Sequence, residues 1–197
     1  MKRETTPDSI PLEPFRSYLM VLAQAHLAPE LRAKIGASDI VQCTFLKAHR
    51  AQAQVRDRMP ANLAAWLRQI LIRVMQDAVR DLRRDKRDIR CERSLATAVN
   101  QTARRLEDLI PADQITPSKA VARADLLVEV SRVLEALPEL QREAILMKHC
   151  QGYTVDEVAQ RLDRSPAAVA SLLRRGLKQV RGQLSPNGRR HTSIPAR

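Results

Sequence analysis

The sequence predicts an all-α protein made of two small helical domains joined by a flexible linker, the second domain being a helix-turn-helix. Apolar residues recur every three or four positions over long stretches, which is the spacing of a helix with one buried face. Only 5 of the 197 residues are glycine, and the alternation of apolar and polar residues that marks strands is hard to find. Hydrophobic residues make up 44% of the chain, which is enough for packed cores.

Composition and periodicity divide the chain into five segments. Residues 1–14 are polar and rich in proline, so we expect a disordered N-terminus. Residues 15–93 form the first helical domain, and 121–184 form the second. Between them, 94–120 contain many polar residues and two prolines, which predicts a linker with at most one or two helical turns. Residues 185–197 are expected to be a basic, disordered tail.

Three helices account for the first domain. The first covers about 15–27, and the second runs from about 39 to 51 with Ser38 as its N-cap. The strongest periodic signal predicts a third helix over about 61–87. Trp66 lies on the apolar face of this third helix, so we expect it in the core.

The second domain carries clear start and stop signals. After a helix that begins near 121, Pro138 suits the first turn of another helix, which Gly152 would end. Thr154 and Glu157 have the spacing of a capping box at the start of a short helix. The turn at 163–166 then supplies an N-cap serine and an initial proline for a last, longer helix. A short helix, a tight turn and a longer helix are typical of a helix-turn-helix.

Positive charge accumulates towards the C-terminus. The net charge is +12, and residues 164–197 contain eight basic residues and no acidic one. Such a block favours a polyanion as partner. The outward face of the last helix has small residues first and basic residues later, which suits entry into a DNA major groove. The candidate DNA-binding residues on this face are Ser165, Ala167, Ala168, Ser171, Arg174, Arg175, Lys178 and Arg181. The alternative is an ordinary helical hairpin with a solvated basic face.

A second charged stretch, over 80–93, admits two interpretations. Acidic and basic residues alternate there at spacings that allow pairs along one helix. The stretch is therefore consistent with a self-paired, solvated helix end as well as with a surface for nucleic acid.

Four segments, in order along the chain, resemble the extracytoplasmic-function (ECF) group of bacterial RNA polymerase sigma factors. They are SDIVQCTFLKA at 38–48, AWLRQI at 65–70, LPELQREA at 137–144 and GYTVDEVA at 152–159. The resemblance extends over about 15–184. It identifies the first domain as similar to sigma region 2 and the second as similar to sigma region 4.

The resemblance implies two partners, core RNA polymerase and promoter DNA, and leaves an anti-sigma factor open as a third. Asp39, Gln42 and Leu46 would bind polymerase, and the last helix would bind the minus-thirty-five element. The residues implied for the minus-ten element are Arg73, Asp77, Arg80, Arg83, Arg84 and Arg87.

Departures from the family pattern keep two alternatives open. The family often has asparagine where Arg73 aligns, and no aromatic residue falls between Trp66 and Tyr153 to stack an unpaired base. One alternative is a helix-turn-helix regulator that does not bind polymerase as a sigma subunit. The other is a decoy that binds polymerase without opening a promoter.

Other classes of function find little support. No nucleophile and base stand in a catalytic pattern, and the histidines and cysteines lack metal-ligand spacing, so we expect neither an enzyme nor a metal or other cofactor. The three cysteines are odd in number and widely spaced, as in reduced proteins. The apolar run at 18–23 is too short to span a membrane, and no signal peptide is evident. We expect a cytoplasmic protein that is monomeric when free.

Overall fold

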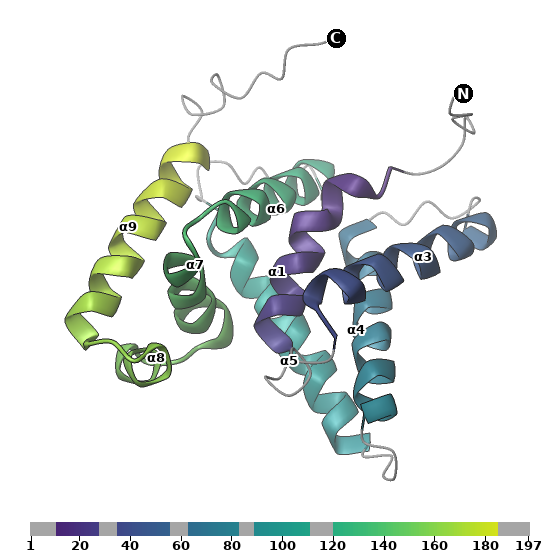
Figure 1. Cartoon of the computed structure of the whole chain (residues 1–197). Helices are drawn as coiled ribbons and strands as arrows, with labels where there is room; N and C mark the ends of the chain where they lie inside the picture. Colours follow the sequence, from purple (N-terminus) through teal and green to yellow (C-terminus); the bar gives the residue numbers. More distant parts are fainter. Residues whose placement is uncertain (1–10, 28–34, 56–62, 83–88, 111–119, 185–197) are drawn as a thin grey trace, which may run out of the picture.

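The computed structural model describes residues 11–27, 35–55, 63–82, 89–110 and 120–184, and every regular element within them is helical (Figure 1). The all-α prediction is thereby confirmed. In chain order the elements are η1 (Glu13–Phe15), α1 (Arg16–His26), α3 (Ala37–Val55), α4 (Leu63–Leu82), α5 (Ile89–Glu107), α6 (Ala120–Glu135), α7 (Glu139–Ile145), the π-helical segment η3 (Leu146–Gln151), α8 (Val155–Leu162) and α9 (Pro166–Leu184).

Helix α1 lies at the centre of the molecule, with contacts to α3, α4, α5, α6 and η3. It is apolar on nearly all sides, and Tyr18, Leu19, Val21 and Leu22 have no exposed surface. A helix that is apolar all round is stable only when other elements cover it on every side. Because elements from both predicted domains cover α1, the two domains share one continuous hydrophobic core.

Helix α5 corrects the prediction of a linker over 94–120. Residues 94–107 belong to this 19-residue helix, which buries Val99, Ala103 and Leu106. The apolar side chains recur at helical spacing, but most are small and stand among Ser, Thr, Asn and Gln, so the stretch resembled a tether. Tertiary packing against α1, α4, α6 and η3 stabilises the helix. Residues 111–119 lie outside the described part of the chain.

Three predicted element ends are also wrong. Residues 11–14 are not disordered, since Leu12 is buried and η1 begins at Glu13. Helix α3 begins at Ala37, so Ser38 is not its N-cap: the Gly36 carbonyl accepts hydrogen bonds from the amides of Asp39 and Ile40, at 3.1 and 3.2 Å. The Asp39 carboxylate in turn accepts a bond from the Gly36 amide, at 3.1 Å. Glycine thus takes the cap position and an acid stabilises the first turn.

The stop signal at Gly152 is confirmed. This glycine has φ +88°, a left-handed conformation that ends η3, and the amide of Tyr153 bonds back to the carbonyl of Met147, at 3.0 Å. Pro138 lies one residue ahead of α7, at its N-cap. The arrangement places α9 on one side of the molecule and α3 and α4 on the other, with α1 between them (Figure 1).

Candidate nucleic-acid interface

The capping box predicted at the start of α8 is present. The Thr154 hydroxyl accepts a hydrogen bond from the Glu157 amide, at 3.2 Å, and the Glu157 carboxylate accepts one from the Thr154 amide, at 2.7 Å. These bonds stabilise the carboxylate form and hold the pKa of Glu157 below its ordinary value. Two backbone donors at the helix start are thereby satisfied, which sets the direction in which α8 leaves the preceding segment.

The turn between α8 and α9 also follows its sequence signals. Asp163 adopts a left-handed conformation, φ 51°, at the C-terminal end of α8. The Ser165 hydroxyl accepts a hydrogen bond from the Ala168 amide, at 3.2 Å, which makes Ser165 the N-cap of α9, and Pro166 is the first helical residue. Caps at both ends of a short turn orient α9 relative to α8.

The inner face of α9 packs closely on α7. Its buried residues are Val169, Leu173, Gly176, Val180 and Leu184. A Cβ atom built on Gly176 would lie 2.6 Å from Cδ1 of Ile145, which is less than a normal carbon–carbon contact. Glycine at this position therefore allows the two helices to approach each other.

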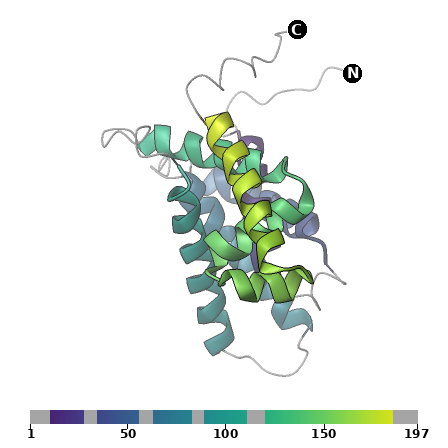
Figure 2. The same cartoon turned by 90° about the vertical axis from the view of Figure 1, so that its left-hand side faces the viewer.

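The outer face of α9 carries all the residues predicted for the upstream DNA element. Arg174, Arg175, Lys178 and Arg181 are exposed, as are Ser165 and Ala167, whereas Ala168 and Ser171 are half-buried. Figure 2 views the molecule from this side and shows α9 crossing the front of it. Among the described residues, no carboxylate forms an ion pair with the cations of α9. The cations are therefore available to DNA phosphates and base edges.

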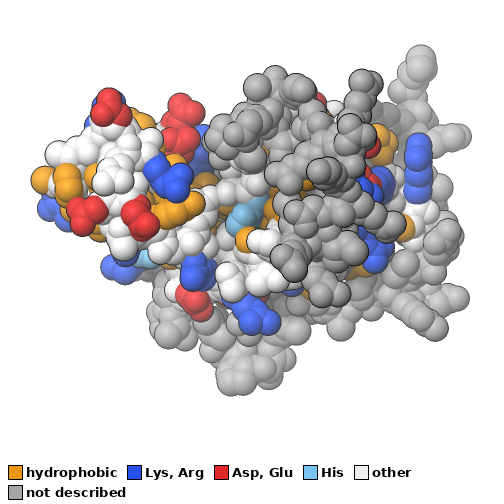
Figure 3. Space-filling view, turned by 90° about the horizontal axis from the view of Figure 1, so that it is seen from below, with side chains coloured by type: hydrophobic (Ala, Val, Ile, Leu, Met, Phe, Trp, Pro, Cys, Tyr) orange, Lys and Arg blue, Asp and Glu red, His pale blue; other side chains and the backbone are white. Residues whose placement is uncertain are grey.

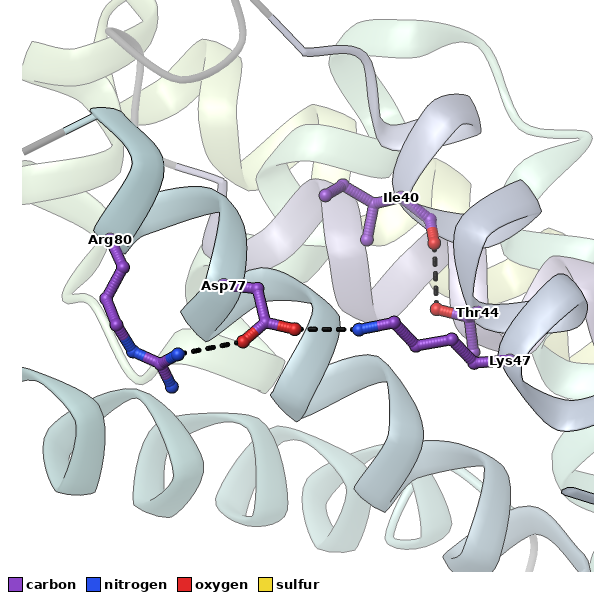
Figure 4. A network of polar contacts seen from close by, with 5 residues as sticks. All are labelled: Ile40, Thr44, Lys47, Asp77 and Arg80. Atoms are coloured by element: carbon purple, nitrogen blue, oxygen red, sulfur yellow. Dashed lines mark hydrogen bonds and ion pairs between the residues drawn. The ribbon is translucent and has the colours of Figure 1, made fainter.

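The predicted downstream set on α4 has a different electrostatic environment. Arg73 and Arg80 are exposed, but Asp77 lies between two cations (Figure 4). Its carboxylate is 2.7 Å from Nζ of Lys47 on α3 and 3.0 Å from Nη1 of Arg80. Arg83, Arg84 and Arg87 lie outside the described residues.

Sequence analysis missed Lys47 as a member of this surface. Lys47 and Asp77 are 30 positions apart, and no local spacing links them. They meet because α3 packs against α4.

The residues predicted to bind polymerase lie together on the outward side of α3. Asp39, Gln42 and Leu46 are all exposed. Leu46 is 58% exposed, the larger of the two exposed large hydrophobic side chains among the described residues, the other being Leu140. An exposed leucine between polar neighbours suits contact with another protein.

Other surfaces show no comparable concentration of one charge. Figure 3 views the molecule from below, and acidic and basic side chains are interspersed on the described part of that face. Over the described residues, no group of three or more His, Cys, Asp and Glu side chains could hold a metal ion. None of the described helices combines the length and the apolar character needed to cross a bilayer.

Comparison with known proteins matches both halves of the chain. Residues 15–85 match the family model of sigma-70 region 2, and residues 127–180 match that of sigma-70 region 4. A probable RNA polymerase sigma factor, RfaY of Xanthomonas campestris, is 32% identical over 152 residues, which are 75% of this chain and 34% of that protein.

Two further relatives carry the name ECF RNA polymerase sigma factor. SigE of Mycolicibacterium smegmatis is 27% identical over 76% of this chain and 52% of its own length. SigM of Mycobacterium tuberculosis is 29% identical over 71% of this chain and 60% of its own length. The chain thus spans between about a third and three fifths of the lengths of these curated relatives.

Proposed function

Because the chain belongs to the ECF group of the sigma-70 family, we propose that it binds core RNA polymerase and directs it to specific promoters, in the cytoplasm. The observation that carries the proposal is the pairing of region 2 and region 4 in one chain, each with an exposed helix of suitable chemistry. A helix-turn-helix regulator that does not bind polymerase is not favoured, because such a regulator has no need of region 2.

We assign the recognition of the two promoter elements to two helices. The outer face of α9, with Arg174 and Arg175 near its middle, would read the minus-thirty-five element in the major groove. The surface that joins α4 to α3, with Arg73, Arg80 and Lys47, would contact the minus-ten element. Binding at two linked sites gains affinity through effective concentration.

Polymerase binding is assigned to the exposed side of α3. Leu46 would insert into an apolar site on polymerase, and the Asp39 carboxylate would pair with a cation there. Asp39 also accepts the cap bond from Gly36, so its substitution by alanine would change helix and contact together. Asp39→Asn removes the charge but retains an oxygen that can accept this bond.

Transcription in vitro with purified core polymerase and a promoter library tests the proposal. We expect transcripts that start at defined promoters only when the chain is added. Leu46→Ala and Asp39→Asn should each weaken binding to core polymerase by roughly five- to thirtyfold, on the order of 1–2 kcal/mol, and leave binding to duplex DNA unchanged. DNA binding by the chain without any affinity for core polymerase would refute the proposal.

A further inference from the structure

Region 2 and region 4 are joined by a bridge of polar side chains as well as by apolar packing. Nε2 of His26, at the end of α1, lies 2.8 Å from the hydroxyl oxygen of Thr102 on α5. The same hydroxyl donates a hydrogen bond to the carbonyl oxygen of Cys150 in η3, at 3.0 Å. Nη1 of Arg105 donates to this carbonyl as well, at 3.3 Å, and the Gln151 amide group donates to the carbonyl of Ala25.

Thr102 is the centre of this bridge. Its hydroxyl has one hydrogen, which is donated to the Cys150 carbonyl, so it accepts the bond from His26. His26 must then carry a proton on Nε2. Thr102 is 1% exposed, and removal of its hydroxyl would leave the histidine donor without a partner in a buried place.

The bridge lies beside space that water can enter. A cavity of about 310 Å³ is lined by residues of α1, α5 and the segment 150–153, among them His26, Thr102, Arg105 and Cys150. When the two regions separate, water can replace the hydrogen bonds of the bridge, at a net cost of only ~1 kcal/mol for each bond. The polar bridge therefore selects this arrangement without making it irreversible.

The arrangement is too short to reach both promoter elements at once. A compact chain of 197 residues has a radius of gyration of about 16 Å and is about 40 Å across. Elements centred near positions minus thirty-five and minus ten are about 25 base pairs apart, which is roughly 85 Å of B-DNA. Two binding sites gain nothing from linkage when geometry forbids them to bind together.

We propose that the bridge of His26, Thr102, Arg105 and Gln151 holds the free chain in a closed state, which must open before region 2 and region 4 can bind their promoter elements together. The need for opening rests on the proposed function, whereas the closed state itself does not. Closure leaves both DNA surfaces exposed but limits the chain to one element at a time. Core polymerase would therefore favour the open state when it binds the two regions at separate sites.

Distance measurements between two spin labels test this proposal on the full chain. Gln69→Cys on α4 and Gln179→Cys on α9 place labels at exposed positions on the two sides of the molecule. Cys43→Ser and Cys91→Ser remove other reactive thiols, and Cys150 stays in place because it is buried. Three variants are compared in this background: Thr102→Val, Thr102→Ser and Thr44→Val.

Thr44→Val is the matched control. Thr44 is also fully buried, but its hydroxyl bonds only to the Ile40 carbonyl within α3, at 2.8 Å. We expect Thr102→Val to raise the open fraction of the free chain roughly tenfold, because a buried donor loses its partner only in the closed state. Thr102→Ser, which keeps the hydroxyl, and Thr44→Val should retain the single short distance of the parent chain.

Two results would overturn the proposal. One is a free parent chain that already has the long distances found with core polymerase and promoter DNA. The other is a Thr102→Val distribution equal to that of Thr44→Val. If polymerase leaves the parent distance unchanged while Thr102→Val opens the free chain, the closed state is supported and the sigma function is refuted.

Discussion

The two helices assigned to DNA differ in how their charge is balanced. The cations on the outer face of α9 have no acidic neighbour on that helix, because Asp163 is the last acid in the chain. On α4, Asp77 pairs with Lys47 and Arg80. The first surface can give its full charge to phosphates, whereas the second must first break or share ion pairs. A helix that looks basic in sequence is therefore not equally basic in structure.

The largest effect is expected from the α9 surface. Arg174→Ala combined with Arg175→Ala should lower affinity for the upstream element about a hundredfold, since one arginine on a base edge contributes about 1–3 kcal/mol. Binding to core polymerase should not change. Fluorescence anisotropy with a promoter duplex measures the first quantity, and co-purification with polymerase measures the second.

Arg132→Ala is the control for this double variant. Arg132 is an exposed arginine on α6 that pairs with Glu129, at 2.9 Å. Its loss removes charge without touching α9. If it weakened DNA binding as much as the double variant does, the effect would come from net charge, and the distinction between the two helices would fail.

The next effect concerns acid and the contact that holds the two surfaces in one body. Burial lowers the pKa of His26 from 6.5 to about 4. Since the unfolded chain binds this proton more readily, the neutral histidine stabilises the fold fully above pH 6.5, and this stabilisation is lost as the pH falls towards 4. The loss amounts to roughly 3 kcal/mol in all, at about 1.4 kcal/mol per pKa unit.

Urea unfolding between pH 7 and pH 4.5 measures this dependence. His26→Asn keeps a donor for Thr102 but does not titrate, so its stability should fall less steeply with acid. A weaker dependence in the same direction will remain, because burial also lowers the pKa of His149. Equal slopes for parent and variant would contradict the assignment to His26.

The inner face of α9 gives a third, smaller effect. Gly176→Ala should destabilise the protein by about 1–3 kcal/mol, since the new methyl group would meet Ile145. Gly182→Ala is the matched control on the same helix, because nothing lies within 4 Å of its added Cβ atom. It should stabilise the protein by up to ~1 kcal/mol through helix propensity. Thermal unfolding of the two variants measures the difference, and shifts of the same sign would refute the close packing of α9 on α7.

The smallest effect is expected at the balanced surface. Asp77→Asn should change stability by less than about 1 kcal/mol, because its ion pairs are exposed. It should also free Lys47 and Arg80 for phosphates, which would raise affinity for downstream-element DNA and steepen its salt dependence by about one unit of the log–log slope. A titration at several salt concentrations checks this. Weaker binding would show instead that the carboxylate itself contacts a base.

Local signals predicted the helix-turn-helix well. The capping box at Thr154 and Glu157, the cap at Ser165 and the stop at Gly152 all involve residues within a few positions of one another. Their effect depends on backbone geometry over a single turn, so it can be inferred without knowledge of the fold. The same logic predicted which residues of α9 face outward.

Signals that depend on distant residues were missed or misjudged. Helix α5 resembled a linker because its apolar face is small and becomes stable only between α1 and η3. Lys47 joined the α4 surface through a partner 30 positions away. Asp39 was predicted in the first turn of its helix, but the cap that it completes is Gly36 rather than Ser38.

The amino-acid order by itself determined the helical class, the family, the turn that sets α9 and the face on which its cations lie. It could do so because helix periodicity, capping and charge along one helix depend on residues that are close in sequence. Only the tertiary structure decided that α5 is a helix, that Asp77 offsets the charge of α4, and that His26, Thr102 and Cys150 join region 2 to region 4. These contacts join residues 30 to 76 positions apart, and only the packing of helices against one another brings such residues together.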